Sequence, residues 1–225
     1  MKKNNIFIAC DTVNISKIKK IIKETKNSKL RVGYKFGLEF LNSKNGRNFL
    51  SKLKNEIIFA DLKLHDIPNT CASAINAITD LKINYLTIHI SSGISALKAA
   101  KKVTNKTKLI GVTILTSLDN KSLKEIGFGM SVKKLVLHQA RLASKANLDA
   151  IVCSAREANL VKKVFKKEII TPGIRIVKKN SNDQKRVLTP KQAFDNGSDW
   201  LVVGREITKG NIKKNIQKLV HHLSQ

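Results

Sequence analysis

Short apolar runs alternate with amphipathic segments along the chain, and this alternation constrains the fold most. Eight runs have the composition of buried β-strands: residues 6–10, 31–36, 57–61, 85–90, 109–114, 150–153, 168–171 and 200–203. The segments between them repeat apolar residues at helical spacing, as in Ile15, Ile18 and Ile22, and carry lysines on the other side. Strands that are apolar throughout and alternate with amphipathic helices indicate a parallel sheet covered on both faces.

The number of strand–helix units favours a closed barrel over an open sheet. Eight units in succession predict a (β/α)8 TIM barrel, and 225 residues lie within the range of that fold. A doubly wound sheet alternates in the same way, but no G-x-G-x-x-G follows the first strand to support a dinucleotide-binding version. Because no linker, repeat or low-complexity stretch interrupts the pattern, we expect residues 1–225 to form one α/β domain.

The chain is strongly basic, with 43 Lys and Arg against 16 Asp and Glu and a formal net charge of +27. This charge alone would suit a nucleic-acid binder. Most of the basic residues are lysines spread over the helical segments, however. Aromatic residues make up only 5% of the chain, so few side chains could stack on nucleic-acid bases. We expect no nucleic-acid partner, but a positive field that draws in small anions such as a phosphorylated substrate.

Other sequence features bear on location and cofactors. The apolar runs are far shorter than the roughly 20 residues that cross a bilayer, so we expect no membrane association. The apolar stretch near the N-terminus is interrupted by Asp11, which argues against a secretory signal and for the cytoplasm. Cys10, Cys71 and Cys153 are odd in number and far apart, which indicates buried small residues and neither disulfides nor a zinc site.

Polar residues gather at the predicted carboxyl ends of the strands. In a barrel these ends surround one site. The residues there are Asp11, Lys35, the run Asp61-Leu62-Lys63-Leu64-His65-Asp66, His89, Thr116, Ser117, Ser154, Arg175, Gly204 and Arg205. Asp61 and Lys63 are two apart, so in an extended chain their side chains point the same way and could join Lys35 and Asp66 in a charged network. Away from a strand end, an Asp-x-Lys pair would be interpreted as a surface salt bridge. His65 and His89 are interpreted as structural residues.

Two features near the C-terminus suggest a phosphate site. Gly204-Arg205 follows the last predicted strand, where glycine lets the backbone approach an anion and arginine can clamp it, although a glycine there is often only a turn residue. Barrels often bind phosphate after strands seven and eight. The polar segment around 173–189 is too long for an ordinary turn and is predicted to be a phosphate-binding lid.

Taken together, these motifs resemble the orotidine 5'-phosphate decarboxylase family, nearly from end to end. The most specific string is Phe59-Ala60-Asp61-Leu62-Lys63-Leu64-His65-Asp66-Ile67-Pro68-Asn69-Thr70. Tyr34-Lys35-Phe36-Gly37 precedes it, and Thr116-Ser117, Thr171-Pro172-Gly173-Ile174-Arg175, Asn182-Asp183-Gln184 and Val203-Gly204-Arg205 follow in order. The resemblance implies decarboxylation of orotidine 5'-monophosphate (OMP) to uridine 5'-monophosphate (UMP), without a metal or other cofactor.

The resemblance also implies a role for each matching residue. Lys63 would donate the proton, with Asp61, Asp66 and Lys35 completing the charged network. The substrate would be contacted by Asp11 and Lys35 at the ribose, Thr116 near the base, and Gln184, Gly204 and Arg205 at the phosphate, with Arg175 at the start of the lid. Asp66, Ile67 and Thr70 would reach the neighbouring subunit's site, which implies a homodimer.

The alternative is a relative that shares Asp-x-Lys-x-x-Asp, namely a Mg-dependent sugar-phosphate decarboxylase or aldolase. Those relatives carry a Glu as a metal ligand where this chain has Lys35, and a lysine there would repel a metal ion. Ile67-Pro68 after Asp66 also fits the orotidine pattern. The sequence therefore favours the metal-free decarboxylase.

Overall fold

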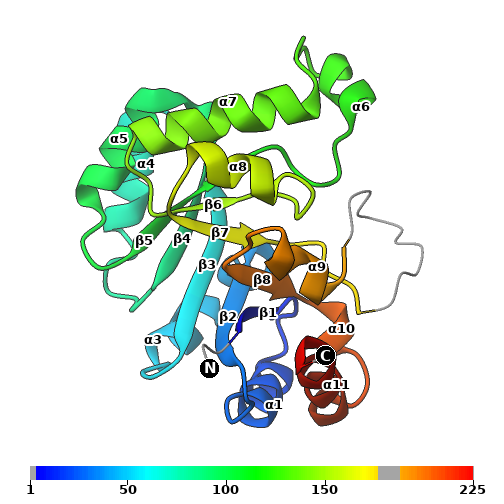
Figure 1. Ribbon diagram of the computed structural model, residues 1–225. Coiled ribbons are helices and arrows are strands. Elements are labelled where there is room, and N and C mark those ends of the chain that lie inside the picture. The colour runs from blue at the N-terminus through cyan, green and yellow to red at the C-terminus, as the bar shows by residue number, and fades with distance from the viewer. Residues whose placement is uncertain (1–3, 177–187, 225) are drawn as a thin grey trace.

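A closed barrel of eight parallel strands forms the centre of the molecule. The computed structural model describes residues 4–176 and 188–224. The strands are β1 (Asn5–Ala9), β2 (Arg31–Gly37), β3 (Ile57–Leu64), β4 (Tyr85–His89), β5 (Lys108–Val112), β6 (Ala150–Val152), β7 (Glu168–Thr171) and β8 (Trp200–Val203). Each strand pairs with the next, and β8 closes the ring by pairing with β1. The predicted (β/α)8 barrel is confirmed, and Figure 1 shows the strands enclosed by helices.

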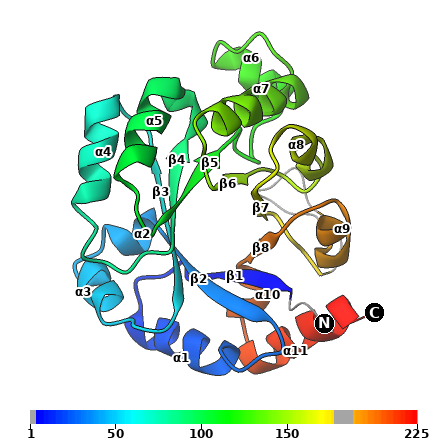
Figure 2. The same cartoon turned by 60° about the vertical axis from the view of Figure 1, so that its left-hand side comes forward.

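Helices surround the barrel on its outside (Figure 2). They are α1 (Ile15–Thr25), α2 (Leu38–Leu41), α3 (Gly46–Ser51), α4 (Pro68–Asn76), α5 (Gly93–Val103), α6 (Asn120–Glu125), α7 (Val132–Lys145), α8 (Ala158–Val164), α9 (Pro190–Asp195), α10 (Arg205–Thr208) and α11 (Ile212–Ser224), with a short 3-10 turn at Ile90–Ser92. At the N-termini of several helices, a side chain accepts a hydrogen bond from a backbone N–H that has no partner within the helix. Asn14 does this for α1 and Thr189 for α9. These caps explain why the helices begin where they do.

Aromatic rings fill the interior of the barrel at its N-terminal end. Phe7 of β1 stacks on Trp200 of β8 with ring centroids 4.1 Å apart, and it meets Phe59 and Tyr85 edge to face. Gly33 on β2 makes room for this cluster, because a Cβ there would lie 2.7 Å from the Phe7 ring. The packed rings close this end of the barrel, so any site must form at the other end.

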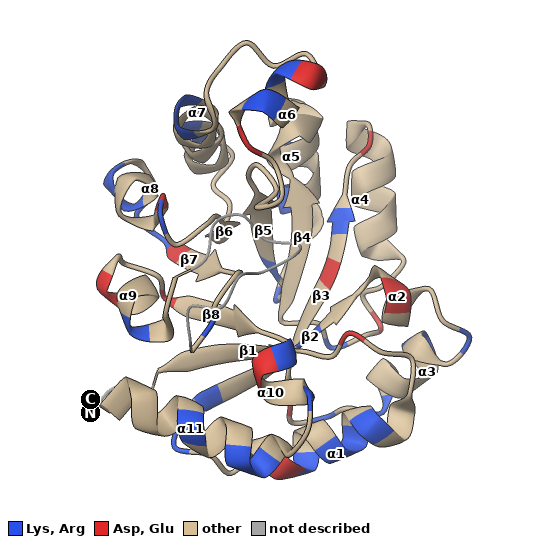
Figure 3. Cartoon of the chain, turned by 90° about the vertical axis from the view of Figure 1, so that its right-hand side faces the viewer, with Lys and Arg blue, Asp and Glu red and all other residues tan. Residues whose placement is uncertain are grey.

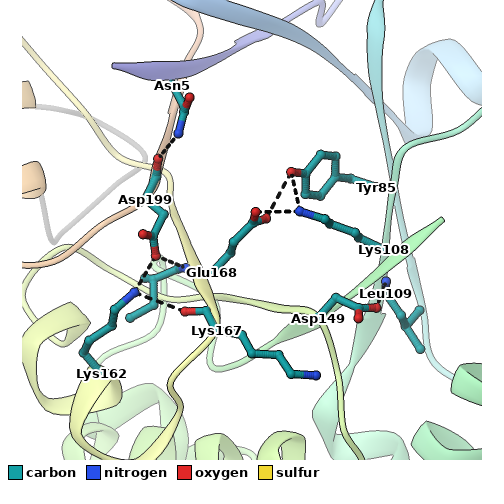
Figure 4. A network of polar contacts seen from close by, with 10 residues as sticks. Asn5, Tyr85, Lys108, Leu109, Asp149, Lys162, Lys167, Glu168 and Asp199 are labelled. Carbon is teal, nitrogen blue, oxygen red and sulfur yellow. Dashed lines mark hydrogen bonds and ion pairs between the residues drawn. The ribbon is translucent and has the colours of Figure 1, made fainter. Parts of the chain in front are cut away.

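Carboxylate and amide side chains tie successive strands together at the same N-terminal end. Asp149, just before β6, accepts a hydrogen bond from the N–H of Leu109 at 2.8 Å, and Asp199, just before β8, accepts one from Ile169 at 2.8 Å. Asn84, just before β4, does the same for a β3 amide at 2.7 Å. Figure 4 shows the two aspartates in this network. This hydrogen bond recurs before β4, β6 and β8, and it fixes where each of these strands starts relative to the strand before it.

Lysines lie mainly on the outer surface, as Figure 3 shows for α1 and α11.

The three cysteines are free and buried, and burial raises the pKa of the Cys10 thiol to about 12, so it stays neutral. Within residues 4–176 and 188–224, no helix has the length and apolar character needed to span a membrane.

Candidate active site

A cavity of about 590 Å³ opens at the carboxyl ends of the strands. Its lining combines charged, polar and apolar residues: Ala9, Asp11, Lys17, Lys35, Phe59, Asp61, Lys63, Val112, Ile114, Leu115, Thr116, Val152, Cys153, Pro172, Gly173, Arg175, Val202, Gly204, Arg205, Thr208 and Lys209. The end of β3 carries both an acidic and a basic residue toward this region (Figure 3). One chain therefore brings most of the predicted site residues into a single cavity.

A charged cluster lies in this cavity, centred on Asp61. The Lys63 Nζ is 2.8 Å from Asp61 Oδ2, and the Lys35 Nζ is 3.5 Å from the same oxygen. Lys35 Nζ also donates a hydrogen bond to Asp11 Oδ1 at 3.1 Å. Asp61 is only 8% exposed, so these contacts are weakly screened by water. Of the predicted charged network, Asp61, Lys63 and Lys35 are thus in direct contact within this chain, whereas Asp66 is not part of the cluster.

The pKa values of the two buried members reflect mutual stabilisation. Burial alone would raise the pKa of Asp61, but the ammonium groups of Lys35 and Lys63, with hydrogen bonds from Lys63 and Thr87, hold it below its ordinary value. Burial alone would lower the pKa of Lys35, but the carboxylates of Asp61 and Asp11 raise it above its ordinary value. Both groups are therefore charged at neutral pH.

The strand geometry at β3 explains how Lys63 reaches Asp61. β3 continues to Leu64, three residues beyond the predicted strand, and its pairing with β4 shifts between Ala60 and Leu64. Lys63 has a φ of +50°, in the left-handed region that non-glycine residues rarely adopt. Simple alternation along an extended strand does not describe this segment, although the two side chains do meet as expected.

Cations line the part of the cavity near β7 and β8. Arg205 opens α10 directly after Gly204. Arg175 follows β7; its Nη1 donates to the Ile174 carbonyl at 3.0 Å, and its Nε lies 3.8 Å from Glu206 Oε1. This arrangement can receive an anionic group. The apolar side chains of the lining, among them Ile114 and Val202, offer a surface for an uncharged ring.

Some predicted residues lie elsewhere. Asp66 and Ile67 precede α4, and Thr70 lies in its first turn. All three are exposed and do not line this cavity, and Ile67 is 65% exposed. Asp66 Oδ1 accepts a hydrogen bond from the N–H of Ile67, and it forms no ion pair within the described parts of the chain. Gln184 and residues 177–187 of the predicted lid lie outside the described residues.

Beyond the apolar lining, four side chains with hydroxyl or ammonium groups at the site were not predicted from the sequence. Thr87 contacts both Asp61 and Lys63, and Lys17, Thr208 and Lys209 line the cavity. Thr87 carried a signal, since it places a hydroxyl between Leu86 and Ile88 in the middle of a buried strand. The two lysines carried none, because lysines occur on every predicted helix and only the fold distinguishes these from the others.

Comparison with known proteins supports the same family. The family model described as Orotidine 5'-phosphate decarboxylase / HUMPS family matches residues 4–218. A Wolbachia protein (sp. subsp. Brugia malayi, strain TRS) named orotidine 5'-phosphate decarboxylase is 43% identical over 224 residues, which cover 96% of this chain and 97% of that protein. A protein of the same name from Psychromonas ingrahamii is 41% identical over 206 residues, 86% of each chain.

A solved structure agrees with these sequence matches. The crystal structure of orotidine 5'-phosphate decarboxylase from Lactobacillus acidophilus superposes with a TM-score of 0.83 at 29% identity, covering 99% of this chain and 100% of that one. The family match and the structural superposition both cover nearly the whole chain, and the family match includes every residue that lines the cavity. The chain belongs to the orotidine 5'-phosphate decarboxylase / HUMPS family.

Proposed function

We propose that this chain is a carboxy-lyase of pyrimidine biosynthesis that converts OMP to UMP and CO2. The 43% identity to a relative of that name supports the reaction. The observation that carries the proposal is the Lys63 ammonium held 2.8 Å from the Asp61 carboxylate inside the cavity, with Lys35 on the same oxygen. A proton donor fixed beside apolar walls suits a reaction that generates a carbanion.

The chemical step needs only the side chains of the cluster. The bond between C6 of the pyrimidine and its carboxylate breaks, CO2 leaves, and the electron pair stays on C6. The Lys63 ammonium stabilises this carbanion and transfers a proton to it, which forms UMP. The neutral amine then regains a proton from water. Asp61 keeps Lys63 charged and in place until the transfer.

The remaining lining residues are proposed to bind the substrate. Asp11 and Lys35 contact the ribose hydroxyls, and Thr116 lies near the base. Gly204 and Arg205 hold the phosphate together with Gln184 and Arg175. This assignment fits the cations near β7 and β8 and the residue types at each position.

We further propose that the phosphate grip contributes to rate as well as affinity. Segment 173–189 would act as a lid in the single domain formed by residues 1–225, and binding energy from the phosphate would favour its closed form. Replacing Arg205 with alanine is then expected to lower kcat/KM for OMP by about 100-fold. An unchanged kcat/KM would contradict the phosphate role of Arg205.

The donor set argues for a metal-free reaction. Within the described residues no group of three or more His, Cys, Asp and Glu side chains could hold a metal ion. Asp61, the carboxylate best placed in the cavity, is already contacted by two ammonium groups, which would repel a divalent cation. No observation favours the Mg-dependent sugar-phosphate alternative, and turnover that is unchanged by EDTA would separate the two.

The working form is proposed to be a homodimer in the cytoplasm. Asp66, Ile67 and Thr70 are exposed in one chain and would complete the site of the partner, which their position outside this chain's cavity supports. A phosphorylated nucleotide does not cross membranes readily, and three free buried cysteines suit a reducing compartment.

The test of the proposed function is the loss of OMP ultraviolet absorbance after addition of purified protein, with EDTA present. We expect turnover by the wild type and none by the Lys63→Ala variant, whose circular dichroism spectrum should match that of the wild type. Absence of turnover by the folded wild-type protein would refute the proposed reaction. Near-normal turnover by Lys63→Ala would refute the role of Lys63 as proton donor.

A further inference from the structure

We infer that Thr87 is a positioning residue, whose single hydroxyl holds both Asp61 and Lys63 in the arrangement that proton transfer requires. The inference rests on the proposed function for its consequence in catalysis. Its structural basis lies in β4, the strand beside β3, and does not depend on the identity of the substrate.

The Thr87 hydroxyl joins the two residues directly. Its Oγ1 donates a hydrogen bond to Asp61 Oδ1 at 3.1 Å and accepts one from the backbone N–H of Lys63 at 2.8 Å. Thr87 is fully buried, so water does not compete for either bond. A hydroxyl has one hydrogen to donate, and here that hydrogen is committed to the carboxylate.

The interrupted pairing between β3 and β4 explains why a side chain is needed here. Ala60 pairs with Leu86 and Leu64 pairs with Ile88, so residues 61–63 of β3 lie opposite Thr87 alone. With the ladder interrupted, the hydroxyl of Thr87 serves as the acceptor for the Lys63 N–H. The hydrogen bond also helps to keep Lys63 at a φ of +50°, which a lysine would otherwise leave.

The two oxygens of Asp61 consequently have different partners. Oδ1 receives the Thr87 hydroxyl, while Oδ2 is left to Lys63 and Lys35. Loss of the hydroxyl would free the carboxylate to rotate and would release the backbone of Lys63. The ammonium would then no longer be aimed at one point in the cavity, and a misplaced proton donor slows the reaction more than it weakens binding.

A purely stabilising role for Thr87 is the competing explanation, and Thr25 provides the matched control. Thr25 is also fully buried, and its hydroxyl also has two partners, the Ile21 carbonyl at 2.7 Å and the Tyr34 hydroxyl at 3.0 Å. It lies on α1 and does not line the cavity. The Thr87→Val and Thr25→Val variants therefore remove the same group from equally buried sites.

The experiment compares wild type, Thr87→Val, Thr87→Ser and Thr25→Val in OMP turnover and in UMP binding. We expect Thr87→Val to lose about 10- to 100-fold in kcat while its dissociation constant for UMP changes by less than about threefold. Thr87→Ser, which keeps the hydroxyl, should restore kcat to within about threefold of wild type, and Thr25→Val should retain wild-type kcat. A kcat for Thr87→Val within about twofold of wild type, or an equal loss in Thr25→Val, would overturn the inference.

A spectroscopic measurement separates this inference from the proposed function. In protein labelled with 13C at lysine Cε, the Lys63 resonance, assigned with Lys63→Arg, should move in Thr87→Val and stay in place in Thr25→Val. An unmoved Lys63 resonance in Thr87→Val would overturn the positioning role whether or not OMP is the substrate. Failure of the wild type to turn over OMP would, by contrast, refute only the proposed reaction.

Discussion

Asp61 is a buried carboxylate whose charge is maintained by neighbouring cations. Removing such a group from water costs several kcal/mol, which close ammonium groups and hydrogen bonds offset only when the geometry is good. Lys63 and Lys35 both approach Oδ2, at 2.8 and 3.5 Å. The same contacts that make the charge tolerable also fix the proposed proton donor, so stability and function depend on the same atoms.

His89 adds a pH dependence beside this cluster. Burial lowers the pKa of His89 below its ordinary value of 6.5, and the charges of His65 and Lys63 lower it further, against the opposing effect of Asp61. The unfolded chain therefore binds more protons than the folded chain as the pH falls below about 6.5, and acid destabilises the fold. We expect the free energy of unfolding to fall less from pH 7 to pH 5.5 in His89→Asn than in wild type.

Urea unfolding at several pH values checks the role of His89. His138→Asn, at an exposed position on α7, controls for the His-to-Asn substitution itself. If His89→Asn and wild type lose the same stability on acidification, then the neutral form of His89 is not what the folded state favours.

The sequence predicted the residues of the charged cluster but not how they are held. Asp61, Lys63 and Lys35 could be placed at the strand ends because the apolar runs end there. Thr87 could not be assigned, because its role depends on the shifted pairing of β3 with β4, which no periodicity reveals. Lys17 and Lys209 could not be told apart from surface lysines until the fold placed them at the cavity.

Among the strands, apolar composition fixed the positions closely, and β3 is the main exception. The predicted segments 168–171 and 200–203 coincide with β7 and β8. β3 extends through Leu64 because its last residues, although polar in part, keep bonding to β4 through Leu64 and the Thr87 side chain. The sequence predicted an end at Asp61, since charged residues usually leave a buried strand.

The start of β8 depends on Asp199, and its removal should be costly. Asp199 Oδ2 accepts hydrogen bonds from the Ile169 N–H at 2.8 Å and from Lys162 Nζ at 2.6 Å. In Asp199→Ala the partly buried amide loses its acceptor, so we expect the free energy of unfolding to fall by about 1–3 kcal/mol. Lys162→Ala removes the partly exposed ion pair and a hydrogen bond to the Lys167 carbonyl, but it leaves the Ile169 amide its acceptor, so it should cost less than about 1 kcal/mol. Urea denaturation of both variants measures the difference.

The comparison between these two variants isolates the strand contact. Equal losses in Asp199→Ala and Lys162→Ala would mean that the contacts of Lys162, and not the bond from Asp199 to β7, account for the effect. Asp149 has the same two kinds of partner before β6, with Leu109 and Lys101, so it offers an independent repeat of the measurement.

The excess positive charge of the complete barrel extends into its cavity. Among the lining residues, the cations Lys17, Lys35, Lys63, Arg175, Arg205 and Lys209 outnumber the carboxylates Asp11 and Asp61. Lys17 lies in the first turn of α1 and Lys209 directly follows α10, and both line the cavity. Neither ammonium has an ion-pair partner within the described residues. We infer that they draw the phosphate of OMP toward Arg205.

Replacing both lysines with alanine should therefore weaken capture without slowing the chemical step. For the Lys17→Ala and Lys209→Ala double variant we expect KM for OMP to rise by about two- to fivefold per lysine with kcat unchanged, and kcat/KM to depend less on salt than in wild type. Lys19→Ala, on the part of α1 outside the cavity, should leave both quantities unchanged. A wild-type KM and salt dependence in the double variant would contradict this role.

The proposed dimer makes a prediction that a single chain cannot satisfy. If Asp66 of one subunit completes the site that contains Lys63 of the other, then Lys63→Ala and Asp66→Ala should each be nearly inactive but complement one another. In an equal mixture after subunit exchange, half of the dimers are mixed and each has one intact site, so about a quarter of wild-type activity should return.

Lys35 supplies the control for this complementation, because it lies in the same cavity as Lys63 and contacts the same Asp61 oxygen. A mixture of Lys35→Ala and Lys63→Ala contains no intact site in any combination of subunits, so it should stay inactive. Recovery with Asp66→Ala but not with Lys35→Ala would place Asp66 in the partner's site and Lys35 in its own. No recovery with Asp66→Ala, despite proven subunit exchange, would mean that each barrel works with its own Asp66, and the exposed segment from Asp66 to Thr70 would need another explanation.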